Sequence, residues 1–162
     1  MDWRYNTIWY HQIAADQQVH WDLKKDKIDP AIFKKVAYAT INHLKFKEQS
    51  FDLLPESDRL RHLELTWANL KELKGLQKFP KLKRLNLEYC IKLHSFSGIE
   101  QLKDSLEFLF INQSKKLKIQ EELLQLNGLK VLCLNACGDI ENLDFLKYFP
   151  DLVDFRFVDT KV

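Results

Sequence analysis

The sequence predicts an α/β solenoid, in which a parallel β-sheet lines the concave face and short 3₁₀ or α-helical connections form the convex face. Two observations lead to this fold class. Segments of the form Leu-x-x-Leu-x-Leu recur at nearly constant spacing, and the apolar residues between them repeat at every third position. The chain has 162 residues, 46% of them hydrophobic, which is enough for one such array.

The recurring segments define the repeats. Five of them begin 22 to 24 residues apart, and a weaker one precedes them. We therefore predict about six stacked repeats over residues 41–162, each burying its apolar triplet against its neighbours. In chain order the triplets are Ile41, Leu44 and Phe46; Leu60, Leu63 and Leu65; Leu82, Leu85 and Leu87; Leu106, Leu109 and Ile111; Leu129, Leu132 and Leu134; and Leu152, Phe155 and Phe157.

The connections between the predicted strands have a different apolar period. A spacing of three predicts 3₁₀ turns or short helices that lie across the convex side. The connection over residues 117–126 is instead predicted to be α-helical, because its acidic pair, Glu121 and Glu122, would lie at a helix start, where the dipole favours negative charge. The first connection shows the spacing of three at Leu70, Leu73, Leu76 and Phe79.

The position eight residues after each repeat start holds mostly small or hydrogen-bonding side chains, which suit a turn that bonds to its neighbour. These residues are Gln49, Ala68, Cys90, Ser114, Cys137 and Thr160. The pattern resembles the leucine-rich repeat superfamily, whose consensus has Asn or Cys at this place. Cys90 and Cys137 match that consensus and Ala68 departs from it. Over residues 41–162 the chain is similar to the short-repeat class of many bacterial proteins, internalins among them, and this resemblance implies a fold without specifying a function.

The two ends of the array are expected to differ. Residues 1–40 predict an N-terminal cap made of a β-hairpin, whose arms carry Trp3 to His11 and Val19 to Leu23, and a short helix that begins at Asp29-Pro30. At the other end, the strand with Phe155 and Phe157 would leave an apolar edge. Either the last connection packs back over this edge, or a second copy of the chain covers it by self-association.

The residues that alternate with the buried leucines should form columns on the concave face. The first column is His43, His62, Arg84, Phe108, Val131 and Asp154, and the second is Lys45, Glu64, Asn86, Phe110, Cys133 and Arg156. Trp67 and Tyr89 follow their strands and should lie at the rim. The cluster of Phe108, Phe110, Val131 and Cys133 predicts an exposed interface hot spot. The alternative is that a loop, the N-terminal cap or self-association buries it.

Composition and motifs exclude several classes of function. The 25 basic and 23 acidic residues give a net charge of only +2, which argues against a nucleic-acid-binding surface. We also find no apolar stretch long enough for a membrane span and no secretory signal, so we expect a cytoplasmic protein. The four glycines are isolated and no catalytic motif occurs, so we expect neither an enzyme nor a cofactor. His43 and His62 would be neighbours without a third ligand, so we expect no metal site.

These observations lead us to expect a non-catalytic protein-binding module. Short bacterial leucine-rich-repeat chains are similar to inhibitor or immunity-type proteins that occlude a cognate toxin or enzyme, so the resemblance implies such a role first. A general adaptor or scaffold that recruits a protein partner is the alternative, because the same surface would serve both roles.

Overall fold

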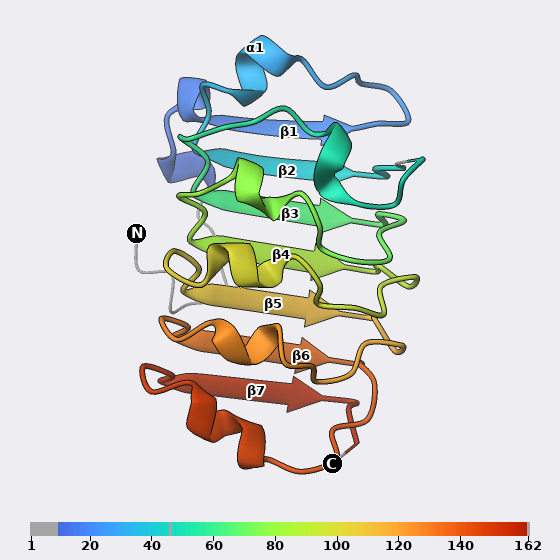
Figure 1. Cartoon of the computed structure of the whole chain (residues 1–162). Coiled ribbons are helices and arrows are strands. Elements are labelled where there is room, and N and C mark those ends of the chain that lie inside the picture. The colour runs from blue at the N-terminus through green and yellow to red at the C-terminus, as the bar shows by residue number, and fades with distance from the viewer. Residues whose placement is uncertain (1–9, 46, 162) are drawn as a thin grey trace.

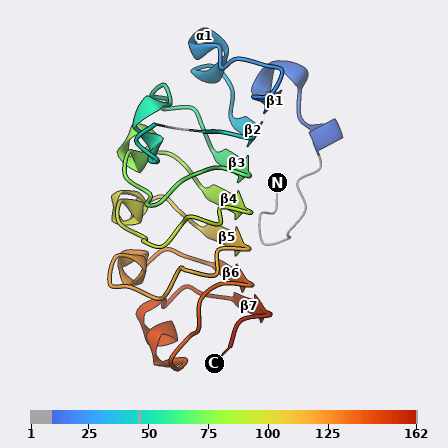
Figure 2. The same cartoon turned by 90° about the vertical axis from the view of Figure 1, so that its right-hand side faces the viewer.

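The computed structural model describes residues 10–45 and 47–161 and consists of one seven-stranded, all-parallel β-sheet (Figure 1). The strands lie side by side in sequence order, as predicted for the repeats. They are β1 (Gln18–Asp22), β2 (Tyr38–Asn42), β3 (His62–Thr66), β4 (Arg84–Glu88), β5 (Phe108–Asn112), β6 (Val131–Asn135) and β7 (Asp154–Val158). The connections between β2 and β7 stack on one side of the sheet (Figure 2). The chain therefore has an α/β fold of stacked strand-and-connection repeats, similar to a solenoid.

The helical elements of the described residues are all short. The α-helix α1 (Pro30–Phe33) follows β1, and Asp29 caps it by accepting hydrogen bonds from the N–H groups of Ala31 and Ile32, as predicted. The remaining turns are 3₁₀. They span Tyr10–Gln12, Ala15–Gln17, Phe51–Leu53, Leu76–Lys78, Ile99–Leu102, Leu123–Gln125 and Asp144–Tyr148. The prediction of an α-helix over residues 117–126 is wrong, because only the 3₁₀ turn Leu123–Gln125 forms there.

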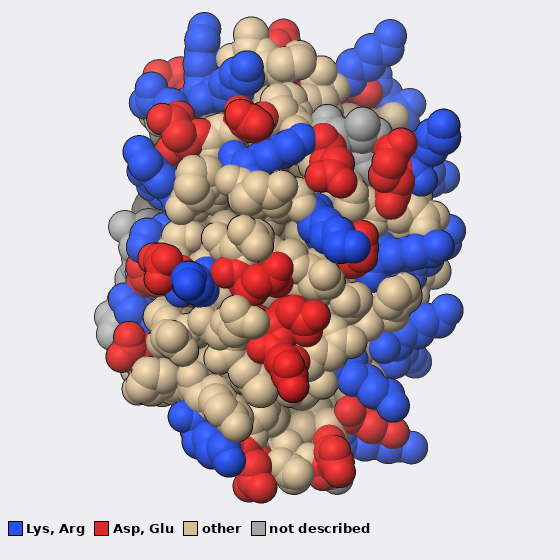
Figure 3. All heavy atoms as spheres, viewed as in Figure 1, with Lys and Arg blue, Asp and Glu red and all other residues tan. Residues whose placement is uncertain are grey.

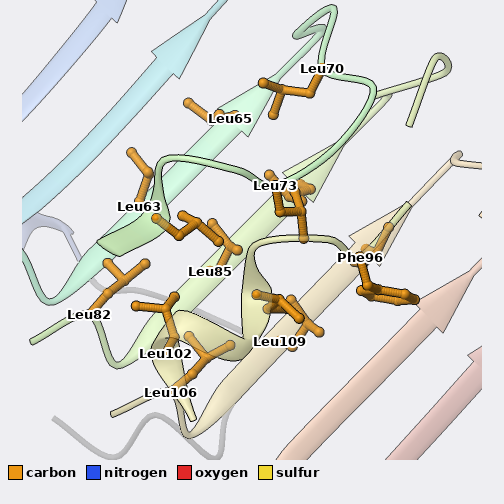
Figure 4. Packing of buried hydrophobic residues seen from close by; sticks show 14 of the residues in the cluster. Leu63, Leu65, Leu70, Leu73, Leu82, Leu85, Phe96, Leu102, Leu106 and Leu109 are labelled. Carbon is orange, nitrogen blue, oxygen red and sulfur yellow. The ribbon is translucent and has the colours of Figure 1, made fainter. Parts of the chain in front are cut away.

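The core lies between the sheet and the connections. Leu63, Leu85 and Leu109 project from the strands, and Leu73 and Leu102 project toward them from the connections (Figure 4). All five side chains are fully buried. Each contributes roughly 1.5–3 kcal/mol by leaving water, and only stacking of consecutive repeats provides that burial.

Close stacking of the connections requires glycine at one position in particular. Gly98 has a φ of 104°, in the left-handed region, and a Cβ atom there would lie 2.5 Å from the backbone of Leu73 in the preceding connection. A side chain at this position would therefore clash with a neighbouring repeat as well as strain its own backbone.

The inward turns after β5 and β7 form the predicted links between neighbouring repeats. The Ser114 hydroxyl donates to the carbonyl of Cys90 over 3.2 Å. The Thr160 hydroxyl donates to the carbonyl of Leu134 and accepts from the N–H of Cys137, each over 3.1 Å. In the first repeat the equivalent residue is Leu44, which is buried, so the prediction of Gln49 at this place is wrong.

The register of the first repeat explains that error. Ala39 pairs with Leu63 and Ile41 with Leu65, so Ile41 takes the last position of its triplet instead of the first. The small side chain of Ala39 fills a position that is leucine in most other repeats, which hides the pattern in the sequence. Phe46, the third member of the predicted triplet, lies outside the described residues.

The β1 end of the sheet is closed by aromatic side chains. Trp21 of β1 stacks on Phe33 of α1 with 6.3 Å between ring centroids. The Phe33 ring also lies 5.9 Å from the ring of Phe79, in the connection between β3 and β4, measured between centroids. β1 is the predicted strand around Val19 and Trp21, and it pairs in parallel with β2, so the sheet continues across the predicted boundary at residue 40. Of the other predicted hairpin arm, Trp3 to Trp9 lie outside the described residues and Tyr10–Gln12 form a 3₁₀ turn.

Candidate functional site

The middle of the sheet face that points away from the core is buried. Phe108, Phe110, Val131 and Cys133 are each at most 7% exposed and form a second apolar cluster, separate from the main core. The prediction of an exposed patch at these four residues is therefore wrong. Strand alternation determines which face a side chain points to, but it does not determine whether other parts of the chain cover that face. Of the alternatives left open by the sequence, burial within a single chain is the one observed.

Polar side chains of the same face form a connected network. The Tyr10 hydroxyl bonds to the Thr40 hydroxyl over 2.9 Å and to Nε2 of His62 over 3.1 Å, so the chain before β1 lies against this face. Arg84 Nε donates to Asn86 Oδ1 over 3.1 Å, and its guanidinium lies 3.7 Å from the centre of the Phe108 ring. His62 and Arg84 are thus buried, although the sequence placed them on an open surface.

Burial and charge determine the protonation of this network. Burial lowers the pKa of His62, because the imidazolium would lose its hydration. Burial would raise the pKa of Glu64, but its interactions with His62 and Arg84 outweigh that effect and lower it. Burial lowers the pKa of Arg84 to about 10 and, together with the charge of Glu64, raises that of Tyr10 to about 12. At neutral pH a neutral His62 therefore bonds through Nε2 to a protonated Tyr10, and the Oε2 atom of an ionised Glu64 lies 3.7 Å from the same nitrogen.

Three stacked aromatic side chains lie at the edge of this face, directly after the strands. His43, Trp67 and Tyr89 follow β2, β3 and β4, and we call these three residues the aromatic rim. His43 stacks on Trp67 with 4.7 Å between centroids and 14° between planes, and Trp67 stacks on Tyr89 with 5.7 Å and 22°. Trp67 is 49% exposed and Tyr89 is 41% exposed. The rim positions predicted for Trp67 and Tyr89 are confirmed, whereas His43 is not beside His62 as predicted.

The backbone of the aromatic rim is held in the left-handed region. The φ angles of His43, Trp67 and Tyr89 are 59°, 57° and 53°. Each of their N–H groups donates one further hydrogen bond to the next strand. The N–H of Trp67, for example, donates to the carbonyl of Glu88 over 2.9 Å. Gln113 adopts the same conformation after β5 without an aromatic ring, so the fold needs this backbone but not a Trp or Tyr. Bulky residues are disfavoured here, which points to a role for the rings beyond the fold.

Asp22 anchors the first ring of the stack. Its Oδ1 atom lies 2.8 Å from Nδ1 of His43. The N–H of Lys24 and the His43 ring both bond to the Asp22 carboxylate and lower its pKa. The carboxylate is therefore ionised at neutral pH and fixes the orientation of the ring against which Trp67 stacks.

Exposed lysines lie in the segments that follow β2, β3, β4 and β5. Figure 3 shows Lys and Arg along the right-hand margin, the side toward which the strands of Figure 1 point. Five exposed lysines in the segments after β2 to β5 are called the lysine strip: Lys45, Lys71, Lys92, Lys115 and Lys116. After β6 the corresponding segment carries Asp139 and Glu141 instead. Lys45 belongs to this strip and not to the second column, where Thr40 stands beside Glu64, so its predicted place is wrong.

Two further predicted residues lie apart from the aromatic rim. Asp154 and Arg156 are on β7, at the far end of the sheet, and Arg156 Nε donates to Asp154 Oδ1 over 2.9 Å. Sequence reasoning missed the stacking of His43 and the lysine strip. Counting residues from the end of each strand would have revealed the strip, but only with the correct register of β2.

No protein-family model matches the sequence, and no curated protein or solved structure matches it. Over residues 10–45 and 47–161, no helix combines the length and apolar character that crossing a bilayer requires. The same part of the chain contains no group of three or more His, Cys, Asp or Glu side chains placed to hold a metal ion. The aromatic rim and the lysine strip therefore form the candidate site on their geometry alone.

Proposed function

We propose that the chain is a leucine-rich-repeat-type solenoid that binds a protein partner through the aromatic rim and the lysine strip and catalyses no reaction itself. The exposed stack of Trp67 on Tyr89 carries this proposal. Trp and Tyr are enriched among residues that dominate binding energy, and a stack that is already formed loses little side-chain freedom on binding. Ile91, which is 65% exposed and follows Tyr89 by two residues, adds apolar area.

The lysine strip indicates what kind of surface the partner presents. Basic side chains beside an aromatic centre favour a partner with an acidic rim around an apolar pocket. Such charges mainly accelerate association and select the partner. The rings of Trp67 and Tyr89, once covered by the partner, hold the complex together. The partner surface is therefore expected to be acidic where it faces Lys92, Lys115 and Lys116.

The role that we favour is a cytoplasmic inhibitor or immunity-type protein that occludes a cognate toxin or enzyme. A surface of rigid rings and fixed backbone suits occlusion, because a pre-organised surface binds without reordering. The adaptor role remains the second candidate, since recruitment needs the same contacts but leaves the partner active.

Substitutions in the aromatic rim test the binding surface. The tagged chain captures its partner from the native cells, and the purified partner is then titrated against Trp67→Asn and Tyr89→Asn by calorimetry. Asn tolerates the left-handed backbone, so these variants remove the rings without adding strain. Each variant should weaken binding by about 2 kcal/mol, or roughly 30-fold.

The matched control is Tyr148→Ala, which removes an exposed ring on the opposite side of the sheet. It should leave the affinity unchanged. If both rim variants are folded and bind the partner as tightly as the original chain, the aromatic rim is not the binding surface.

A second measurement distinguishes the two roles. The activity of the captured partner is followed while the chain is added up to and beyond equal amounts. Loss of activity that is complete at a ratio of one to one supports the inhibitor. Full activity in the saturated complex contradicts the inhibitor and leaves the adaptor.

A further inference from the structure

The last strand of the sheet has an exposed apolar edge. β7 pairs with β6 on one side, and within the described residues no strand pairs with its other side. Phe157 is 41% exposed, whereas the equivalent residues of the inner strands, such as Leu134 and Ile111, are buried. Val153 and Val158 add exposed apolar side chains on either side of it, at 69% and 59%. An open edge of this kind is a template for another strand.

The backbone of β7 shows which residues could bond to an added strand. The carbonyl of Val158 accepts from the N–H of Ala136 over 2.7 Å, so it points toward the β6 side. Backbone groups alternate between the two sides of a strand, so those of Asp154 and Arg156 also face β6. The groups of Phe155 and Phe157 then face outward. The Val153 N–H does not, because it donates to the carbonyl of Lys130 on the β6 side over 2.9 Å, so Phe155 is the first residue of β7 whose N–H and carbonyl both face outward.

We propose that a second copy of this chain pairs with β7 in an antiparallel arrangement, with the twofold axis at Phe155. In this register the backbone groups of Phe155 bond to those of Phe155 in the second copy. Val153 faces Phe157 of the second copy, which joins two exposed apolar side chains. Asp154 faces Arg156 of the second copy, and this pair forms twice across the axis.

Charge complementarity selects this register. An axis at Arg156 would place two guanidinium groups directly opposite each other, and like charges in that position are destabilising. With the axis at Phe155, the two Asp154 carboxylates and the two Arg156 guanidinium groups alternate on one face. Each chain already brings Asp154 and Arg156 together by an internal hydrogen bond, so both are held in place.

The resulting dimer closes on itself and leaves the candidate binding surface free. A twofold interface uses the same edge of both copies, so no further strand can be added there. The aromatic rim follows β2 to β4, well away from β7, and the dimer would present one rim from each copy. This inference concerns a different surface and does not depend on the proposed partner.

Charge reversal across the axis tests the proposal. Sedimentation equilibrium of the chain over a range of concentrations should give a reversible monomer and dimer. Asp154→Arg alone and Arg156→Asp alone each place like charges opposite each other and should weaken the dimer at least ~10-fold. The double variant Asp154→Arg/Arg156→Asp restores the complementary pairs and should return the dimer constant to within about threefold.

Glu121→Lys, an exposed charge reversal on the connection side, is the control and should leave the dimer constant unchanged. Circular dichroism of every variant confirms that the chain is folded. A chain that is monomeric up to concentrations on the order of 1 mM would overturn the proposal. A dimer that is insensitive to the single reversals, or one that the double variant fails to restore, would overturn it as well.

Discussion

The middle of the sheet face and the aromatic rim beside it carry similar side chains in different surroundings. Phe108 and Phe110 project from β5 and are buried, whereas Trp67 and Tyr89 follow β3 and β4 and are exposed. Both pairs lie on regular positions of the repeat. The position within a repeat therefore fixes the direction of a side chain, and long-range contacts of the chain determine whether a partner can reach it.

The largest expected effect is on the stability of the sheet face. Phe108→Ala removes a fully buried ring that also lies against the Arg84 guanidinium. The substitution should lower the free energy of unfolding by about 3–5 kcal/mol, measured by urea denaturation. A loss below about 1 kcal/mol would mean that Phe108 is exposed in solution and would erase the contrast with the aromatic rim.

Stability should depend on pH through His62. Its pKa is lowered in the folded chain, mainly by burial and against the opposing effect of Glu64. As the pH falls through about 6.5, the unfolded chain takes up a proton at His62 that the folded chain does not. The stability associated with neutral His62 is therefore complete above about pH 6.5 and is lost as the pH falls toward the folded pKa.

His62→Gln should reduce the loss of folding stability at acidic pH. The free energy of unfolding is measured by urea denaturation at several pH values between about 5 and 8, the range in which an ordinary histidine titrates. The exposed His94 is the control, and His94→Gln should leave the pH dependence of the free energy of unfolding unchanged. If the pH dependence of stability is unaltered in the His62 variant, the imidazole is solvated, contrary to the buried network.

A smaller effect on stability is expected at the aromatic rim. Trp67→Asn loses stacking worth about 0.5–1.5 kcal/mol but relieves part of a left-handed backbone penalty of about 1–2 kcal/mol. The free energy of unfolding should therefore change by less than about 1 kcal/mol in either direction, by the same denaturation assay. A loss like that of Phe108→Ala would make the ring a structural residue and weaken its assignment to binding.

The cysteine thiols of the folded chain should react very slowly with thiol reagents. Cys90, Cys133 and Cys137 are buried, and burial raises the pKa of Cys133 to about 11. In a Cys90→Ser/Cys137→Ser variant, a colorimetric thiol reagent should modify Cys133 rapidly only after denaturation. Rapid modification of the folded variant at neutral pH would mean that the sheet face is open at β6.

Local patterns in the sequence predicted much of the fold. The leucine triplets located β3 to β7, and the residues after them located the inward turn where Ser114 and Thr160 bond to neighbouring repeats. Asp29-Pro30 located α1. These features follow from short-range periodicity and capping, which a single sequence contains.

The errors arose where one repeat departs from the apolar pattern and where the fold depends on contacts between distant residues. Ala39 replaces a leucine in β2, so the apolar pattern suggested a later register and misplaced His43 and Lys45. The burial of Phe108 and Arg84 depends on how the chain covers the sheet face, which local periodicity does not encode. The stack of His43 on Trp67 joins residues from two repeats and became visible only with the correct register.

The most direct test of the contrast between the aromatic rim and the sheet face is hydroxyl-radical footprinting of the folded chain, read residue by residue by mass spectrometry. Trp67 and Tyr89 should be oxidised rapidly, and Phe108 and Phe110 should be protected until the chain unfolds. Rapid oxidation of Phe108 and Phe110 in the folded chain, with Trp67 and Tyr89 protected, would contradict the account and return the candidate surface to the middle of the sheet.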